Sequence, residues 1–566
     1  ALQAPAKVSP PKKSGARSPQ LELQGFKLPK GFTAELVASE EQGVGKPITV
    51  QWDTAGRMWT MTAFEYPIDA NENKAHAEAI YKRGGKDKIL VFDNPSAPGP
   101  QTPRVFADGL VIPLGMTPTA DGALVQYGTE IRHYYDKNQD GKAEGFDTIL
   151  KGFGIQDSHL FPHQFERAPG GWYYLAQGLF NYSDVVRQGG KAFADGSKSV
   201  SFRQCKLARF RPDGSEFESV SAGPNNIWGL IQKNNGETFI QEANDQGIPV
   251  VEHLQGTHYT TGSKEKLRSY APQIPSTLPG QQMGGTGLSG IALTEEKASA
   301  FNQLHPKAEN VFYIVNPITN RIQIITTVRD ENGDHSYTKQ TDFMTSEDKW
   351  FRPVAAHFGP DGCLYIVDWY NKVISHNEVP RAHPDRDKTS GRIWRIRPDN
   401  HTPKTPLNLT KANPAQLIQA LQNPNEKIAR LAWYAIADRK AEKTPALTEN
   451  LLKLVNDTST PISSRTLAFW SLEDLGEWQK HSSELAKLAS DQSPFMRFEV
   501  IRSLANLHLN EKEFLSIASA FPTDENYRVR AELANTIRYH RAPTPGIIAL
   551  AAQLGQTPLK GKSLTA

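Results

Sequence analysis

Residues 354–368 read VAAHFGPDGCLYIVD: an apolar segment, a Gly-Pro-Asp-Gly turn and a second apolar segment. Asp-Gly turns supply the positive φ that a tight connection between antiparallel strands needs, so this stretch predicts a β-hairpin. The same pattern recurs along the chain at 48–62, 114–127, 163–177, 228–242 and 289–315. We therefore expect repeated hairpins from residue 28 to residue 398.

The turns of these hairpins fall at uneven intervals of roughly 50 to 75 residues. Such an interval accommodates one four-stranded blade together with loops of variable length. The pattern predicts a mainly β domain over 28–398, a β-propeller of six blades, or seven. The alternative is a series of unrelated hairpins that do not close into a ring.

From residue 399 the pattern changes to amphipathic helices joined by Asn-, Asp- and Pro-rich turns. Each repeat has a polar turn residue followed by an arginine: Asn423 and Arg430, Asp457 and Arg465, Asp491 and Arg497, Asp524 and Arg530. The turn residues are 34, 34 and 33 positions apart. This period predicts an all-α, HEAT-like solenoid over 399–550, followed by a tail at 551–566, and a protein partner is expected for it.

Composition limits the class of protein. The 566 residues are too many for one ordinary core, and 64 Lys and Arg against 61 Asp and Glu argue against a nucleic-acid partner. Because the chain has no CxxC or CxxCH, zinc ribbons and covalently attached c-type haem are excluded. A disulfide between the two cysteines, Cys205 and Cys363, stays open.

The N-terminal segment is rich in Pro, Ser and Lys. We expect residues 1–27 to be a disordered tether, as would remain after removal of a signal peptide, and the protein to be periplasmic or extracellular. No run approaches the roughly 18–20 apolar residues that cross a bilayer, so no transmembrane segment is expected.

Ordered motifs across the predicted propeller carry a family resemblance. They are LPKGFTAELVASEE (28–41), QWDTAGRMWTMTAFEYP (51–67), YYDKNQDGKAEGFDTILKGFG (134–154), DKWFRPVAAHFGPDGCLYIVDWY (348–370) and GRIWRIRP (391–398). Together they resemble the propeller of the planctomycete and verrucomicrobial (PVC-type) membrane-bound dehydrogenase or haem-binding proteins. That propeller is distantly similar to soluble quinoprotein glucose and aldose-sugar dehydrogenases. HEAT-like repeats after the propeller are also usual in the family.

The resemblance implies a catalytic histidine. In the quinoprotein enzymes a histidine acts as general base on a sugar hydroxyl, fourteen residues before a strand tyrosine, and His159 stands fourteen before Tyr173. Asp157 takes the place of an acidic neighbour. His163 is a second candidate base, since Pro162 argues against a helix on which the two histidines would bind metal. The alternative for both histidines is a structural hydrogen bond to a neighbouring blade.

The resemblance also implies pyrroloquinoline quinone, held by an Arg-Asn pair, a late arginine and a lysine. Asn226 matches the asparagine and Arg352 is the candidate for the late arginine. Asn225 stands where the family has arginine, and the lysine has no clear counterpart. The carboxylates of the quinone would lose two cations, each contributing about 1.5–3 kcal/mol through charge-assisted hydrogen bonds.

The mouth of the propeller is predicted to be a carbohydrate site. Carboxylates and amides bind hydroxyl groups, arginine binds acidic groups, and aromatic rings stack on sugar faces. The candidates are Glu65, Tyr66, Asn226, Trp228, Arg352, His357, Asp368, Trp369, Tyr370 and His376. The alternative is that the aromatic residues fill space between blades. The loop at 181–206 is expected to cap this mouth.

DKNQDGKAEGFD (136–147) is a candidate calcium loop. Oxygen ligands stand at positions 1, 3, 5, 7, 9 and 12 of an EF-hand-type cage: Asp136, Asn138, Asp140, the Lys142 carbonyl, Glu144 and Asp147. A strand precedes the loop, so a structural calcium ion on a blade is expected. A solvated turn is the alternative.

Three functions are consistent with these observations. The leading hypothesis is an exported oxidoreductase that acts on a sugar or oligosaccharide, with a histidine base and a quinone-type acceptor. The second is a non-redox lyase or hydrolase acting on acidic glycans. The third is a catalytically inactive glycan-binding scaffold.

Overall fold

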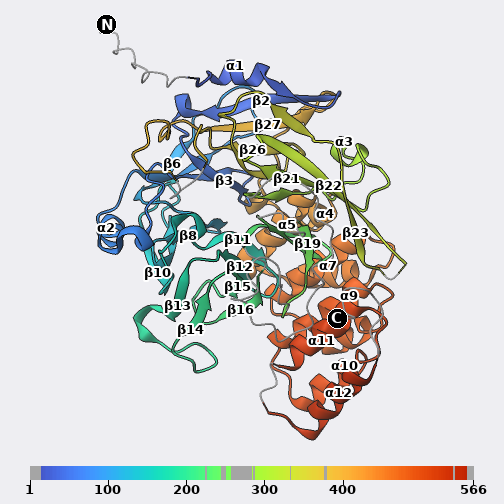
Figure 1. The fold of residues 1–566 in the computed structure, drawn as a ribbon. Coiled ribbons are helices and arrows are strands. Elements are labelled where there is room, and N and C mark those ends of the chain that lie inside the picture. The colour runs from blue at the N-terminus through green and yellow to red at the C-terminus, as the bar shows by residue number, and fades with distance from the viewer. Residues whose placement is uncertain are drawn as a thin grey trace.

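Six β-sheets stand around a common axis, and a stack of helices lies beside them (Figure 1). The computed structural model describes residues 15–223, 226–243, 250–256, 283–284, 287–331, 333–374, 379–538 and 542–557. The predicted six-bladed propeller followed by a helical region is confirmed.

Consecutive strands within each blade pair antiparallel. Blade 1 contains β3 (Pro47–Trp52), β4 (Met58–Thr62), β5 (Asp87–Phe92) and β6 (Arg104–Leu110). Blade 2 contains β7 (Met116–Thr119), β8 (Gly122–Tyr127), β9 (Glu130–Tyr135) and β10 (Gly145–Lys151), extended by β13 (Tyr182–Arg187) and β14 (Val200–Arg203). Blade 3 contains β11 (His163–Ala168), β12 (Trp172–Gln177), β15 (Lys206–Phe210) and β16 (Phe217–Ala222).

The second half of the ring is less regular over its described residues. Blade 4 contains β17 (Ile227–Gln232), β18 (Thr238–Glu242) and β19 (Val250–His253). Blade 5 contains β20 (Ile291–Ala292), β21 (Asn310–Asn316), β22 (Arg321–Arg329), β23 (His335–Lys339), β24 (Met344–Ser346) and β1 (Phe26–Lys27). Blade 6 contains β25 (Pro353–Phe358), β26 (Leu364–Asp368), β27 (Arg392–Pro398) and β2 (Phe32–Ser39).

The first strands of the blades line the axis. β3 contacts β7, β7 contacts β11, β11 contacts β17, β17 contacts β20, β20 contacts β25, and β25 contacts β3. The blades therefore form a closed ring. Each first strand begins at one end of the ring, which we call the mouth, and turns into the second strand at the other end, which we call the turn face.

The segment 181–206 does not cap the mouth. Its strands β13 and β14 form a hairpin whose first strand pairs with β10, the outer strand of blade 2. The exposed polar edge of β10 offers free backbone groups, and β13 satisfies them. The predicted cap is therefore an extension of the sheet at the periphery of the ring.

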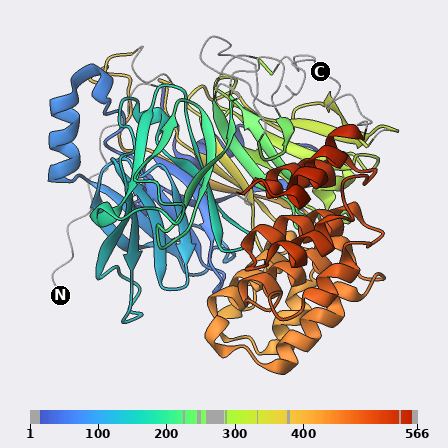
Figure 2. The same cartoon turned by 90° about the horizontal axis from the view of Figure 1, so that it is seen from below.

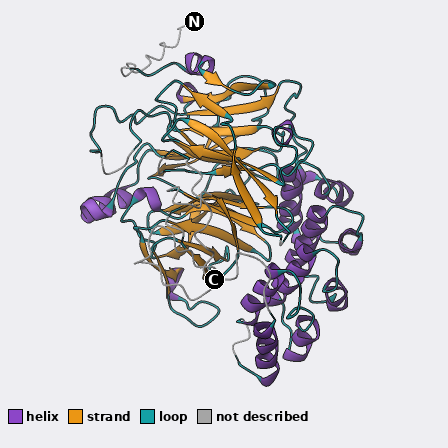
Figure 3. Ribbon diagram, turned by 45° about the vertical axis from the view of Figure 1, so that its right-hand side comes forward, coloured by secondary structure: helices purple, strands orange, loops and turns teal. Residues whose placement is uncertain are grey.

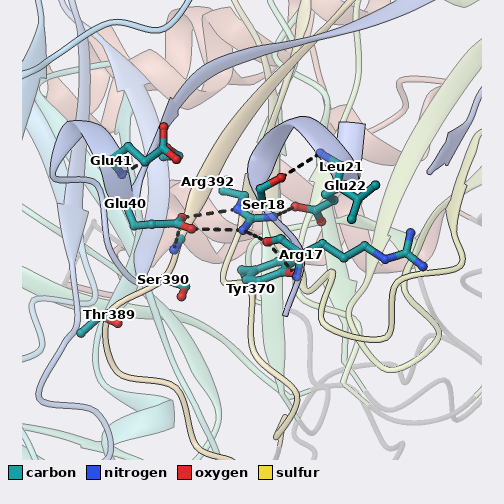
Figure 4. Close-up of polar contacts among 12 residues, drawn as sticks. Arg17, Ser18, Leu21, Glu22, Glu40, Glu41, Tyr370, Thr389, Ser390 and Arg392 are labelled. Carbon is teal, nitrogen blue, oxygen red and sulfur yellow. Dashed lines mark hydrogen bonds and ion pairs between the residues drawn. The ribbon is translucent and has the colours of Figure 1, made fainter. Parts of the chain in front are cut away.

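The N-terminal segment closes the ring around a buried arginine. β2 pairs with β27, from Phe32 opposite Pro398 to Ser39 opposite Arg392. The side chain of Arg392 is 1% exposed, and its guanidinium donates to the carboxylates of Glu22 and Glu40 (Figure 4). The same group lies 3.5 Å from the centroid of the Tyr370 ring.

Residues 15–27, expected in a disordered tether, contain α1 (Pro19–Gln24) and β1. Besides the ion pair of Glu22, the ring of Phe26 packs 4.9 Å from that of Trp394 and 5.1 Å from that of Phe351. Burial, and then the negative charge of Asp368, raise the pKa of Glu22. These partners lie more than 300 positions away in sequence, so local composition could not indicate them.

The helices form two sets, one in the loops of the propeller and one in the C-terminal region. Besides α1, the propeller carries α2 (Ala70–Arg83), α3 (Ala300–Gln303) and the short 3-10 helices η1 (Glu40–Gln42), η2 (Ser158–Leu160) and η3 (Gln188–Gly190). The C-terminal region contains α4 (Pro414–Leu421), α5 (Glu426–Asp438), α6 (Pro445–Asn456), α7 (Ile462–Asp474), α8 (Ser482–Leu488), α9 (Pro494–Ser503), α10 (Glu511–Ala518), α11 (Tyr527–Ile537) and α12 (Pro545–Gln556), with η4 (Leu409–Lys411), η5 (Lys440–Glu442) and η6 (Leu504–Asn506).

The C-terminal helices stack as hairpins. α5, α7, α9 and α11 pack on one another in sequence order, and α4, α6 and α8 each pack on the helix that follows. The repeated polar residues explain part of this stacking. Arg465 pairs with Asp491 and Arg497 with Asp524, so the arginine of one repeat binds the turn of the next.

The helical region docks on the turn face of the ring (Figure 2). Arg167 at the end of β11 pairs with Asp438 of α5 at 2.7 Å. Gly236, in the turn between β17 and β18, has φ of +89°, and a Cβ there would lie 2.4 Å from an oxygen of Glu499. Only glycine allows the turn of blade 4 to approach α9 this closely.

Two sequence questions are answered by the fold. Cys205 precedes β15 and Cys363 precedes β26; both are buried, and they do not form a disulfide with each other. Among the described helices, none combines the length and the apolar character required to span a membrane (Figure 3).

Arg392→Leu should lower the free energy of unfolding by about 3–5 kcal/mol, because it leaves buried carboxylates without their cation. Arg203→Leu is the matched control, since its pair with Asp184 is exposed on both sides and is screened by water. Urea unfolding followed by circular dichroism measures both variants. Equal stability of the two would contradict the structural role of Arg392.

Candidate functional site at the mouth and along the axis

Two histidines and a tryptophan meet at the mouth between blades 3 and 4. The ring of His159 is stacked on that of Trp228, with centroids 5.4 Å apart and planes at 27°. The ring of His163 is stacked on Trp228 more closely, at 4.0 Å and 19°. The structure thus brings together three of the predicted site residues.

The turn that carries His159 is held by hydrogen bonds to Asp157, Asn181 and Asp69. Asp157 caps η2, because its carboxylate accepts the backbone N–H of His159 at 3.0 Å. The amide of Asn181 accepts the N–H of Asp157, and Asp69 accepts both the N–H and the hydroxyl of Ser158. Asp157 therefore positions the turn, and its buried carboxylate is directed to the backbone.

Both ring nitrogens of His163 face backbone carbonyls. Nδ1 lies 2.5 Å from the oxygen of Phe161 and Nε2 lies 2.6 Å from the oxygen of Ile227. Burial lowers the pKa of His163, although the two carbonyl acceptors oppose that shift. The side chain of His163 links blade 3 to blade 4, and its nitrogens are not directed into the mouth.

Asn226 and Arg352, the predicted quinone ligands, contact the protein's own backbone. The amide oxygen of Asn226 accepts the N–H of Leu179 at 3.2 Å. The guanidinium of Arg352 donates to the carbonyls of Asn371, Pro317 and Lys372 at 2.9, 2.8 and 3.1 Å. This donor set does not fit the carboxylates of pyrroloquinoline quinone, since all three nitrogens of the Arg352 guanidinium already donate to backbone carbonyls. Asn225 and His376 lie outside the described residues.

The candidates of blades 1 and 6 form two groups. Asp368 accepts the backbone N–H groups of Arg352 and Tyr370, and Tyr370 is buried beside Arg392. Trp369 is half-buried and meets the Tyr66 ring edge to face, with centroids 5.5 Å apart. Tyr66 and Trp369 are thus aromatic residues available at the mouth, whereas Asp368 and Tyr370 belong to the core. Glu65, next to Tyr66, is half-buried and favours the charged form of a nearby lysine.

That lysine, Lys388, was missed by sequence reasoning, as was Lys46. Burial lowers the pKa of both, in each case to about 8. The ammonium of Lys46 donates to the carbonyls of Trp369 and Tyr370 and pairs with Asp387 at 3.3 Å. The ammonium of Lys388 donates to the carbonyl of Tyr66. No motif marks either residue; only the convergence of blades 1 and 6 buries them.

A cavity of about 110 Å³ runs along the axis of the ring. On the mouth side it is lined by residues including Gln164, Trp228 and Ser289. His357, another predicted site residue, lines the cavity and contacts the hydroxyl of Thr49 at 2.9 Å. Burial, and then the charge of Lys427, lower the pKa of His357 to about 3, so its ring is neutral.

The floor of the cavity is supplied by the helical region. Glu426, Lys427 and Arg430 from the first turns of α5 close its turn-face end. Arg430 donates to Asn234 at 3.1 Å and to the carbonyl of Gln232, both at the end of blade 4. The sequence marked Arg430 as one of the repeat arginines; its contact with the propeller was not predictable from the repeat.

The candidate calcium loop joins β9 to β10 on blade 2. The carboxylate of Asp136 accepts the N–H groups of Asp140 and Gly141, and Asn138 also accepts from Asp140. Glu144 accepts the N–H of Asn138 at 3.1 Å. Asp147, on β10, and Lys142 are both exposed. The carboxylates at positions 1, 5 and 9 of the motif (Asp136, Asp140 and Glu144) thus lie around one loop.

A second acidic cluster, Glu237, Glu309 and His335, has the spacing of metal ligands. Lys233 and Arg329 already pair with these carboxylates, at 3.1 Å for Lys233 and Glu237 and 2.9 Å for Arg329 and Glu309. The cations neutralise the cluster, which therefore offers no net attraction to a metal ion.

Fold and site together define a six-bladed propeller whose axial cavity is floored by an attached helical region. Residues 18–400 match the family described as "Domain of unknown function (DUF7133)", and the chain belongs to this family. No curated protein sequence matches the chain.

Solved structures that are similar to the chain include the following three. They are a luciferin-regenerating enzyme (10% identity, 67% of this chain and 99% of that chain, TM-score 0.38), a glucose dehydrogenase (14%, 64% and 98%, 0.37) and the PQQ domain of pyranose dehydrogenase from Coprinopsis cinerea (10%, 66% and 97%, 0.37). Similarities at this level concern the propeller and assign no substrate to this chain.

Glu426→Gln should remove a pH dependence of stability. Burial, and then the charge of Glu295, raise the pKa of Glu426 from 4.5 to about 7, while Lys427 opposes the shift. A raised folded-state pKa gives stability that is complete below pH 4.5 and lost as the pH rises through about 7. The variant should therefore gain stability relative to the wild type between pH 5 and pH 8, on the order of 2 kcal/mol.

Thermal unfolding at pH 5, 6, 7 and 8 measures this difference. Glu449→Gln is the control, since Glu449 is exposed and paired with Lys453 on the far side of α6. Parallel pH profiles of the wild type and Glu426→Gln would show that Glu426 is charged in the folded protein at all these values.

Proposed function

We propose that the protein is an exported, carbohydrate-acting propeller, in which a sugar binds at the mouth and His159 accepts a proton from one of its hydroxyl groups. The stack of His159 on Trp228 carries this proposal. An indole is a common platform for a pyranose ring, and the half-buried imidazole of His159 lies beside it. Tyr66 and Trp369 extend the aromatic surface.

His159 suits a general base because its turn is fixed. The cap from Asp157 and the anchor from Asp69 hold the η2 backbone, so the imidazole is oriented before a ligand arrives. The ring then removes a hydroxyl proton as the charge on the sugar oxygen develops. His163 supports the same surface by holding blade 4 to blade 3.

The reaction that follows proton removal separates two candidates. The resemblance to quinoprotein dehydrogenases favours oxidation of the sugar. The commitment of Arg352 and Asn226 to backbone groups favours the second candidate, a non-redox lyase or hydrolase, because no described residue pair replaces the quinone cradle. A glycan-binding scaffold without catalysis is the third outcome of the same tests.

The proposal has two further parts. The helical region is a HEAT-like module of the PVC-type family, and its outer helices bind a protein partner. The loop at 136–147 binds a structural calcium ion. The hydrogen bonds that gather Asp136, Asn138 and Asp140 around one loop support the calcium site.

His159→Gln should lower catalytic turnover on a responsive sugar by about 100-fold or more, because the amide cannot take up the proton. Dye reduction with added pyrroloquinoline quinone tests oxidation on a panel of sugars, and product mass together with the absorbance of unsaturated uronate tests the lyase. His508→Gln, an exposed histidine of the helical region, is the control. Unchanged turnover in His159→Gln would remove it from the mechanism.

Millimolar Ca²⁺ should raise the melting temperature, and EDTA should reverse the effect, since a ligand that binds only the folded state stabilises it. Asp140→Asn should abolish this response, while Asp213→Asn, in a turn of blade 3, should leave it intact. Differential scanning calorimetry measures the shifts. A response that is the same in both variants would place calcium elsewhere.

A further inference from the structure

The axial cavity has polar walls at its floor and an aromatic wall at its mouth. Trp228 stands on the mouth side, and Gln51, Glu166 and Lys427 line the other end. A volume of about 110 Å³ is enough for several water molecules. The cavity therefore has room for one small polar ligand in place of those waters.

Lys427 brings an ammonium group to the wall of this cavity. Within the described part of the chain, no residue accepts a hydrogen bond from its ammonium, and the Trp52 ring centroid is 6.0 Å away. Burial lowers the pKa of Lys427, while the carboxylate of Glu166 opposes that shift. Lys427 is half-buried, so its ammonium faces the cavity with donors that an oxygen atom of a ligand or of water can accept.

Glu166 faces the same space with spare accepting capacity. Its contacts with Arg430 and with the hydroxyl of Tyr434 are long, at 3.5 and 3.3 Å, and both involve the same oxygen. Its side chain is 26% exposed. One carboxylate oxygen thus remains for a donor that enters the cavity.

The charges at the floor decide what kind of ligand fits. Three carboxyl groups (Glu166, Glu295 and Glu426) stand with two cations (Lys427 and Arg430). The carboxylate of Glu166 beside Lys427 would repel an anion, and the two cations would repel a metal ion. A neutral ligand with several hydroxyl groups can instead accept from the ammonium and donate to the carboxylate, and adjacent hydroxyls of a sugar do both.

We infer that the axial cavity binds a neutral, polyhydroxylated ligand of monosaccharide size, with Lys427 and Glu166 contacting neighbouring hydroxyl groups. This inference rests on the proposed carbohydrate function and deepens it, since it places sugar below the mouth and gives the helical region a part in binding. α5 is then a wall of the binding site as well as a docking element.

Isothermal titration calorimetry of the full chain with D-glucose, D-galactose, D-mannose and myo-inositol tests the inference. Lys427→Met should weaken binding by about tenfold or more, and Glu166→Gln should weaken it likewise. Lys453→Met is the matched control, because Lys453 is an exposed lysine of α6. The melting temperature of Lys427→Met should equal or exceed that of the wild type, since the variant removes a half-buried charge.

The outcomes separate the two proposals. If the wild type binds none of the four polyols, the cavity site fails, and the turnover tests on the sugar panel decide the carbohydrate function separately. If the wild type and Lys427→Met bind equally while His159→Gln binds weakly, only the cavity site fails. Should Lys427→Met not fold, Lys427→Leu, which also lacks a donor, gives the same comparison. Unchanged binding there, together with unchanged binding in Glu166→Gln, would overturn the inference.

Discussion

The pairing of β2 with β27 is the constraint on which the rest of the structure depends. A propeller has a central cavity only when its last blade meets its first, and here one strand from each end of the domain completes blade 6. The backbone hydrogen bonds between β2 and β27 do not by themselves fix the register of the two strands. Arg392 fixes it, because its guanidinium joins Glu22 before β2, Glu40 after it and the ring of Tyr370. The ring is thus closed by ion pairs as well as by backbone hydrogen bonds.

The helical region depends on the closed ring. Its first long helix, α5, places Arg430 against blade 4 and Asp438 against blade 3, two contacts that exist only when the turns of those blades stand side by side. Further along, Arg528 and Tyr527 of α11 both meet Glu252 of β19. These polar contacts specify orientation more than they add stability. Stability comes from a continuous apolar cluster in which Trp52 and Tyr365 of the propeller join Leu409 and the helices that follow.

The sequence predicts those features of the fold that depend on residues close together in the chain. Asp-Gly and Asn-Gly turns indicated the hairpins, their spacing indicated six blades, and the repeated Asp and Arg indicated stacked helices; Arg465 with Asp491 shows why that repeat exists. The site is different, because it is assembled from first strands of several blades. The resemblance assigned Arg352 to a cofactor, yet three carbonyls from other loops occupy its guanidinium. Composition likewise could not show that Phe26 packs on Trp394.

The charged residues around the axial cavity are a second feature that the sequence does not predict. Lys427 follows the helix cap Asn425 in a sequence typical of a solvated first turn, and lysine there normally points to water. The propeller covers it in part instead, together with Glu426 and Glu295, whose raised pKa values reflect the same partial loss of solvent. Charges concentrated in this way do not stabilise the interface between the two regions, since apolar residues of similar size would cost less. Their grouping around one cavity, below an indole at the mouth, is explained more simply by a hydroxylated ligand that hydrogen-bonds to them.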